Sequence, residues 1–160
     1  MWEKSSGYHP AHLKYYLPNE DGFWEAQWYE RGKGDFEPVQ TSKACVGFSI
    51  CSELWFFEHA RAYGKKGAEL IVTPRCTEKA SVETWLVAGR ATAVSAGAYS
   101  LSSNRTGSEG GIEFGGQGWI VDPDGEVLGV TTKDRPFLTL EIDLTQAHAA
   151  QNTYPRYIPE

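Results

Sequence analysis

The chain has 160 residues, enough for one domain with a buried core, and 41% of them are hydrophobic and 13% aromatic. These values are typical of a globular protein and exclude a disordered chain. Fifteen basic against 21 acidic residues give a net charge of −6, which argues against nucleic-acid binding, since that function needs a concentrated basic surface. No apolar run reaches the ~18 residues of a membrane span, and residues 1–6 lack the apolar core of a signal peptide. We therefore expect a cytoplasmic protein that binds neither nucleic acid nor membrane.

The three cysteines, Cys45, Cys51 and Cys76, match no disulfide framework. If Cys45 and Cys51 share a strand, they lie roughly 20 Å apart at ~3.3 Å per residue, too far to bridge. An odd number leaves at least one free thiol, which fits a reducing compartment.

The first half of the chain shows strand and helix patterns in alternation after an irregular start. Residues 1–40 are polar and aromatic with many turn signals, so we expect extended loop with short elements there. The elements expected next are a buried strand over 44–50, a helix over 53–66, a strand over 68–73 stopped by Pro74, a helix over 81–96 with Ser81 as N-cap, and a strand over 98–103.

The second half of the chain predicts a hairpin, one more strand and a short helix. Asp122-Pro123-Asp124-Gly125 has proline and glycine where a type I or II turn places them. The expected elements are a flexible loop over 107–111, hairpin strands over 118–121 and 126–130, a half-buried strand over 137–143 and a helix over 144–151. Alternation in the first half implies crossover helices on a sheet, so the predicted fold class is α/β with a mixed sheet.

The strongest candidate for chemistry is Cys51, where the predicted buried strand ends and a helix begins at once. A thiol at such a turn is exposed and lies close to the N–H groups of the helix N-terminus, which favour the thiolate and can hold an oxyanion. The plain alternative is a small buried hydrophobic residue, because free cysteine is among the most buried residue types. Cys45, in mid-strand, and Cys76, in the loop after Pro74, lack this geometry.

Several blocks of sequence resemble the nitrilase-like carbon–nitrogen hydrolases. Residues 46–58 and 66–74 resemble the segment in which a strand delivers the catalytic cysteine, an acidic residue follows two positions later, and the next helix runs into an apolar strand. Downstream, 103–107 and 116–128 resemble later strands and loops of the family. The resemblance runs from about Lys14 to the C-terminus in order. It implies part of the family's α-β-β-α sandwich, with mixed sheets and helices on the outer face.

The resemblance also assigns roles within the expected site. Cys51 matches the nucleophile, which forms a thioester, and Lys14 matches the lysine that stabilises the tetrahedral oxyanion. Glu25 matches a second glutamate that orients lysine or substrate in many members, and Ser52 belongs to the turn whose N–H groups would help to bind the oxyanion. Without the resemblance, Lys14 and Glu25 would be ordinary surface residues. The thiolate and the lysine supply the chemistry, so the resemblance implies no metal and no cofactor.

One part of the family pattern is missing. Members carry a general-base glutamate well before the lysine, but only 13 residues precede Lys14 here, and Glu3 is the only acid among them. We therefore expect residues 1–160 to form a single carbon–nitrogen hydrolase domain, truncated at its N-terminus and nearly inactive alone. Loss of the first strands would expose apolar sheet surface and a strand edge, so we also expect homo-oligomers.

The resemblance leaves the small-molecule substrate open among nitriles, primary amides and N-carbamoyl compounds, which share this machinery. Cys51-Ser52-Glu53 differs from the Cys-Trp-Glu segment of true nitrilases, which favours an amide-type substrate. The main alternative is a truncated or degenerate hydrolase that acts only as a binding or assembly partner.

Two other catalytic sites find little support in the sequence. A zinc site would need His9 and His12 together with cysteines, but the chain has no Cys-x-x-Cys pair and its cysteines lie far from these histidines. A serine hydrolase would need a Gly-x-Ser-x-Gly elbow, and the second glycine after Ser49 is missing.

Overall fold

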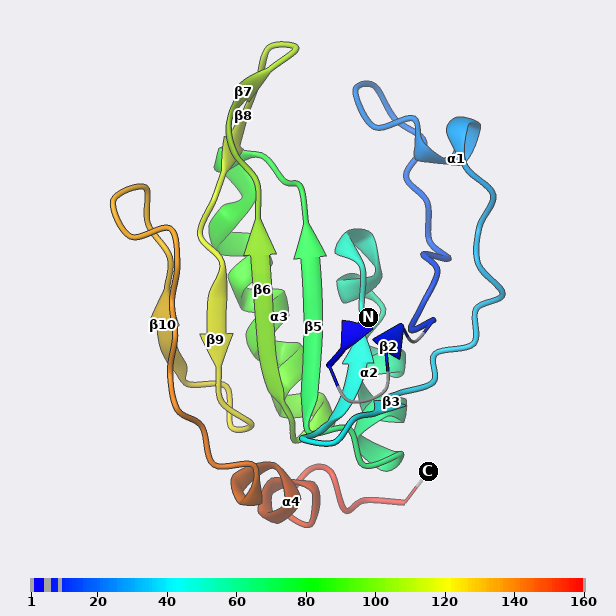
Figure 1. Ribbon diagram of the computed structural model, residues 1–160, viewed down its shortest axis with the longest axis vertical. Coiled ribbons are helices and arrows are strands. Elements are labelled where there is room, and N and C mark those ends of the chain that lie inside the picture. The colour runs from blue at the N-terminus through cyan, green and yellow to red at the C-terminus, as the bar shows by residue number, and fades with distance from the viewer. Residues whose placement is uncertain (1, 5–6, 9, 160) are drawn as a thin grey trace.

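The computed structural model describes residues 2–4, 7–8 and 10–159, and its centre is a mixed sheet of six strands (Figure 1). The strands are β3 (Val39–Gln40), β4 (Cys45–Phe48), β5 (Leu70–Arg75), β6 (Tyr99–Asn104), β9 (Trp119–Val121) and β10 (Val127–Val130). Their order across the sheet is β10-β9-β6-β5-β4-β3. β4, β5 and β6 run parallel, whereas β3 and the β9–β10 hairpin are antiparallel to their neighbours. The predicted α/β class with a mixed sheet is confirmed.

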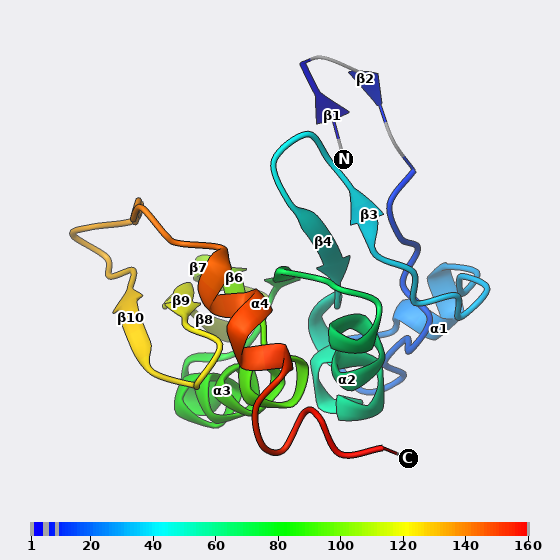
Figure 2. The ribbon, with the colours of Figure 1, turned by 90° about the horizontal axis from the view of Figure 1, so that it is seen from below.

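Two helices connect the parallel strands and cover one face of the sheet (Figure 2). α2 (Phe57–Lys65) follows β4 after a short 3-10 helix, η1 (Cys51–Trp55). α3 (Val82–Ala96) leads into β6 and follows a second 3-10 turn, η2 (Lys79–Ser81). This layer of helices on one face is the arrangement that the sequence predicted.

Glycine permits the closest contacts of these helices. A Cβ at Gly64 in α2 would lie 2.1 Å from the carbonyl oxygen of Ala96, and a Cβ at Gly89 in α3 would lie 2.5 Å from the Trp119 ring. Any larger residue would push the layers apart, because protein interiors are close-packed. The sequence therefore sets the depth at which α3 packs on the sheet.

Shorter elements complete the chain. They are β1 (Trp2–Glu3), β2 (Gly7–Tyr8), α1 (Glu25–Trp28), β7 (Thr106–Glu109), β8 (Ile112–Gly115) and α4 (Thr145–Gln151). Between β2 and β3 the chain is mostly extended loop, as predicted, and Phe36 of this loop packs against Ala60 and Tyr63 of α2.

The sheet face opposite α2 and α3 carries a row of apolar side chains. The register pairs Phe48 with Val72, Val72 with Leu101, and Leu101 with Ile120, and all four are half-buried. Within the described residues no helix lies over this row (Figures 1 and 2). We call these four residues the apolar row.

Pro74 does not end the second strand, as the sequence had suggested, but lies within β5. The carbonyl of Val72 accepts from Ser49 N on the β4 side, so the missing N–H of Pro74 would point to the same side. Because β4 ends at Phe48, no residue of β4 lies opposite Pro74 to accept a hydrogen bond from it, so the proline breaks no hydrogen bond of the sheet.

The helix predicted over 53–66 is interrupted, and Ser81 does not cap the next one with its side chain. Phe56 adopts φ −101 and ψ 77 between η1 and α2, and its ring stacks on Tyr16 with 3.5 Å between centroids. This contact favours a break between η1 and α2, and the spacing of apolar residues along the sequence does not reveal such a break. Ser81 immediately precedes α3, but its hydroxyl donates to the carbonyl of Glu78.

Two predictions in the second half are wrong. The expected loop over 107–111 instead forms most of β7 and the turn of the β7–β8 hairpin, whose turn residues Gly110 and Gly111 have φ of 58° and 84°. Two consecutive left-handed residues suit a two-residue hairpin turn, so the glycines marked a turn and not a loop. The strand expected over 137–143 does not form, and Phe137 is 89% exposed. Apolar alternation cannot make a strand where no neighbouring strand supplies hydrogen-bond partners.

Candidate active site

Cys51 occupies a strained turn at the end of β4. Ser49 N still bonds to Val72 O, Ile50 is extended, and Cys51 then turns to φ 52 as the first residue of η1. A left-handed conformation costs a residue other than glycine about 1–3 kcal/mol, and such strain clusters at functional sites. The predicted strand-to-helix turn therefore exists, and it directs Cys51 into a cavity.

Glu53 fastens this turn to the loop that carries Lys14. Glu53 is 1% exposed, and its carboxylate accepts from Ile50 N at 2.7 Å, Tyr15 N at 2.7 Å and His12 Nε2 at 2.8 Å. A buried carboxylate is stable only when its lone pairs are satisfied, as they are here. The sequence marked an acid at this position only through the family resemblance, and it gave no sign of the His12 partner.

The structure brings Lys14 and Glu25 together. Lys14 Nζ lies 2.6 Å from Glu25 Oε2, and their side chains are 12% and 27% exposed. Ser52 is held to the same loop, because its hydroxyl donates to Tyr16 O at 2.5 Å. Cys51, Ser52 and Glu25 thus line one cavity, and Lys14 joins this group through Glu25.

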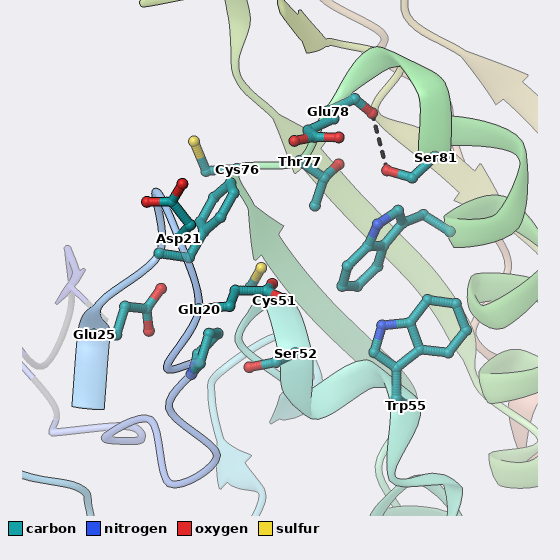
Figure 3. Close-up of a pocket in the computed structure, with 13 residues that line it drawn as sticks. Glu20, Asp21, Glu25, Cys51, Ser52, Trp55, Cys76, Thr77, Glu78 and Ser81 are labelled. Atoms are coloured by element: carbon teal, nitrogen blue, oxygen red, sulfur yellow. Dashed lines mark hydrogen bonds between the residues drawn. The ribbon is translucent and has the colours of Figure 1, made fainter. Parts of the chain in front are cut away.

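A cavity of about 470 Å³ opens beside Cys51. Cys51, Ser52 and Glu25 line it, whereas Lys14 does not line it and is ion-paired with Glu25. The other lining residues are Pro18, Glu20, Asp21, Phe23, Trp55, Cys76, Thr77, Glu78, Ser81 and Trp85. In Figure 3, Cys51 lies between the acidic side chains of Glu20 and Asp21 and the indole of Trp55. The volume suits a small molecule.

The other two cysteines have different surroundings. Burial raises the pKa of the Cys45 thiol, and the nearby Glu69 raises it further. This disfavours a thiolate at Cys45, as expected for a cysteine in mid-strand. Cys76 lines the same cavity as Cys51, although the sequence assigned it no part in a site.

Sequence reasoning also missed Arg75, a buried arginine at the end of β5. The only signal in the sequence was a charged residue directly after an apolar strand. The same pattern is equally typical of a strand whose end reaches the surface. The aromatic wall of the cavity was missed as well. It consists of Trp55 and Trp85, whose ring centroids are 4.9 Å apart.

Within residues 2–4, 7–8 and 10–159, no three His, Cys, Asp or Glu side chains are grouped as a metal site. Of the imagined zinc pair, His12 binds Glu53 and His9 lies outside the described residues. None of the helices in the described ranges is long and apolar enough to span a membrane.

Comparison with known proteins identifies the family. A model of the carbon–nitrogen hydrolase family matches residues 4–152, so the chain belongs to this family and the sequence resemblance is confirmed. The N-carbamoylputrescine amidase of Oryza sativa subsp. japonica is 28% identical over 155 residues, which are 87% of this chain and 52% of that protein.

Solved structures confirm the nitrilase-type fold. The carbon–nitrogen hydrolase from Helicobacter pylori G27 is 28% identical with a TM-score of 0.83, covering 90% of this chain and 55% of that one. A mutant of the amidase from Nesterenkonia sp. AN1, with acrylamide added at its active-site cysteine, is 27% identical with a TM-score of 0.61, covering 74% and 46%. The chain spans about half the length of these relatives.

Proposed function

We propose that this chain carries the cysteine and lysine of an amide-hydrolysing site, with Cys51 as the nucleophile. The observation that carries the proposal is the left-handed turn at Cys51, which opens onto the cavity beside the Lys14–Glu25 pair. The active-site cysteine of the Nesterenkonia amidase, a relative of similar fold, supports a cysteine nucleophile.

The reaction begins when the Cys51 sulfur attacks the carbonyl carbon of the amide. A C–S bond forms while the π electrons of the carbonyl move to its oxygen. The N–H groups at Cys51 and Ser52 and the ammonium of Lys14 stabilise this oxyanion, and Glu25 orients Lys14. The carbonyl then re-forms, the C–N bond breaks, and ammonia or an amine leaves after taking a proton. Water cleaves the thioester to a carboxylic acid and returns the thiol.

The proton acceptor for Cys51 is, in this proposal, a glutamate from the part of the family fold that this chain does not match. The family resemblance implies such a residue, and the chain spans about half the length of its relatives. General-base catalysis typically raises the rate by roughly 10²–10⁴. The 160 residues alone would therefore turn over more slowly, by about that factor, than a chain that includes this glutamate.

The proposed substrates are small amides or N-carbamoyl compounds rather than nitriles. The residue after the nucleophile is Ser52, whose hydroxyl is held by the loop, and not the tryptophan of the Cys-Trp-Glu segment. Two named relatives are amidases. With free cysteines and no membrane-spanning helix in the described residues, we propose a cytoplasmic location.

A second candidate function is that of an assembly partner without activity. The apolar row favours it, because half-buried apolar side chains across four strands form a surface for association. Homo-oligomers are part of this proposal, and light scattering tests them. A monodisperse monomer would count against it.

Ammonia release from a panel of amides, N-carbamoyl compounds and nitriles tests the enzyme proposal. The chain is compared with a version extended upstream by a glutamate-containing segment. Both versions are also made with Cys51→Ala and, as the matched control, with Cys45→Ala. We expect release by the extended chain, little by the short chain, none after Cys51→Ala, and no loss after Cys45→Ala. Full release by the extended Cys51→Ala variant would refute the nucleophile, and robust turnover by the short chain would refute the missing base.

A further inference from the structure

The cavity beside Cys51 is lined by acidic side chains and by no basic one. Glu20, Asp21, Glu25 and Glu78 line it, and the described lining residues include no lysine, arginine or histidine. A cleft lined by charges of one sign attracts ions of the opposite sign, and it does so most strongly where its walls are apolar. The charge of the lining therefore bears on which substrates the cavity admits.

Three of these four carboxylates have no counter-charge. Glu25 is paired with Lys14, but the other three side chains form neither an ion pair nor a hydrogen bond within the part of the chain that the structure describes. Even Lys79, the neighbour of Glu78 in sequence, pairs instead with Glu113 at 2.8 Å. We call the three side chains the unpaired acids: Glu20, Asp21 and Glu78.

Across the cavity from Glu20 and Asp21 the wall is aromatic. In Figure 3, Cys51 lies between these two acidic side chains and the indole of Trp55. Trp55 is 40% exposed, and the centroid of its ring lies 4.9 Å from that of Trp85. Tryptophan is the side chain that attracts a cation most strongly through its ring. A substrate at Cys51 would thus have carboxylates on one side and indoles on the other, and both favour a positive charge.

We propose that the amide substrate of this site carries a positive charge, such as an ammonium group, that the unpaired acids attract and the tryptophans contact. The inference rests on the proposed function, because it names the substrate class of the Cys51 site. The cavity of about 470 Å³ has room for a small organic cation. The competing explanation is that the unpaired acids, which are exposed, are ordinary solvated residues of a chain with a net charge of −6.

Charged thiol reagents measure the preference without turnover. Methanethiosulfonates that carry a trimethylammonium, a sulfonate or no charge all react alike: the thiolate attacks the thiosulfonate, a disulfide forms and methanesulfinate leaves. Rates at Cys51, followed by mass spectrometry, are divided by those of a cysteine peptide. We expect the corrected rate of the cation to exceed that of the anion at least about tenfold. The preference should shrink when salt is raised from about 0.05 to about 0.5 M, because salt screens exposed charges.

Two variants separate the contributions of the unpaired acids and of the tryptophans. The triple variant Glu20→Gln, Asp21→Asn, Glu78→Gln should bring the cation-to-anion ratio to within about threefold of that of the peptide. Trp55→Leu should slow the cationic reagent about twofold to fivefold, as for the loss of one exposed cation–π contact, and leave the anionic reagent unaffected.

The matched control removes three exposed acids that do not line the cavity, Glu126→Gln, Asp134→Asn and Glu141→Gln. It changes the net charge by the same amount and should keep the wild-type preference. The proposal is overturned if Cys51 of the wild type shows the ratio of the peptide, or if the control triple variant lowers the preference as much as the first one does.

Ammonia release tests the substrate class directly. 4-Aminobutanamide and pentanamide have the same length, and only the first carries a charge. We expect the upstream-extended chain to hydrolyse the first with a kcat/KM at least about tenfold higher, and the triple variant of the unpaired acids to lose this difference. Equal kcat/KM for both amides would overturn the inference and leave the hydrolase. A reagent preference without ammonia release from any amide would remove the hydrolase and leave a cavity that selects cations.

Discussion

The two walls of the cavity are built in different ways. One, which we call the strand wall, carries Cys51, Thr77 and Trp85 on or just after β4, β5 and α3, elements fixed by sheet hydrogen bonds and close packing. The other, the loop wall, carries Glu20, Asp21 and Glu25 on an extended segment with little regular structure. Cys51, the proposed nucleophile, is thus placed by the fold, and the charged groups facing it are placed by side-chain contacts.

Those contacts converge on the Cys51 turn. Glu53 accepts from His12 and from Tyr15 N, Ser52 donates to Tyr16 O, and Gly32 N donates to Lys14 O within the loop. Buried carboxylate contacts are strong because the interior offers no competing water. We infer that Glu53 is the main connection between the two walls.

Glu53→Gln should cost the most. The amide would present a donor where three N–H groups now meet a carboxylate, and breaking a buried pair costs about 3–5 kcal/mol. We expect urea unfolding to show a loss in this range. Hydrogen exchange should accelerate in residues 12–32 much more than in β5 and β6.

Glu58→Gln is the matched control, since Glu58 is exposed on α2 nearby, and it should change stability by less than about 0.5 kcal/mol. Uniformly faster exchange in both walls would show that Glu53 stabilises the whole domain and does not connect its parts.

Lys14→Met should affect rate much more than stability. Loss of one oxyanion-stabilising group typically lowers turnover about 10²–10³-fold. The Lys14–Glu25 pair is partly exposed, so its loss should cost no more than about 1 kcal/mol of unfolding free energy. Ammonia release by the upstream-extended chain and urea unfolding measure the two effects.

Lys33→Met, an exposed lysine on the same loop, should change neither quantity. If Lys14→Met unfolds the loop wall as Glu53→Gln does, the lysine is structural and its proposed contact with the oxyanion is wrong.

Gly89→Ala tests the strand wall. The added Cβ would lie 2.5 Å from the Trp119 ring, and overpacking of this kind typically costs about 1–3 kcal/mol. It should lower the stability of the sheet while the loop contacts of Glu53 persist. Thr84→Ala, at an exposed position of α3, controls for helix propensity and should be neutral or slightly stabilising. A stabilised Gly89→Ala variant would mean that α3 moves freely on the sheet.

The difference between the strand wall and the loop wall also explains which features the sequence could predict. Strand and helix periodicity located β4, β5, α3 and the turn at Cys51, because local patterns encode regular elements. Lys14 and Glu25 were found only by family resemblance, since neither carries a local signal. The contacts of Glu53 span 41 and 38 residues to His12 and Tyr15, and no local pattern encodes such a pairing. Residues 137–143 show the opposite case: the sequence has the alternating pattern of a strand, but no strand forms because no neighbouring strand pairs with it.

The smallest expected effect concerns His59, which packs α2 against the loop. Its Nε2 lies 2.9 Å from the Tyr16 hydroxyl, and its ring stacks on Phe36 with 3.6 Å between centroids. Burial, and to a lesser degree His12, lower the pKa of His59 below its ordinary 6.5, with Glu58 and Glu53 opposing the shift. The unfolded chain therefore binds this proton more readily than the folded one.

This linkage fixes the sign of the pH dependence. The stability contributed by neutral His59 is fully present above pH 6.5 and is lost as the pH falls below 6.5 toward the lowered folded pKa, because protons then favour the unfolded chain. We expect urea unfolding between pH 5 and 7.5 to show a flatter profile for His59→Gln than for wild type. Tyr16→Phe keeps the ring stack and should retain the wild-type slope. A steeper profile in His59→Gln would mean that the imidazole is charged in the folded protein and joins the loop to α2 as a cation.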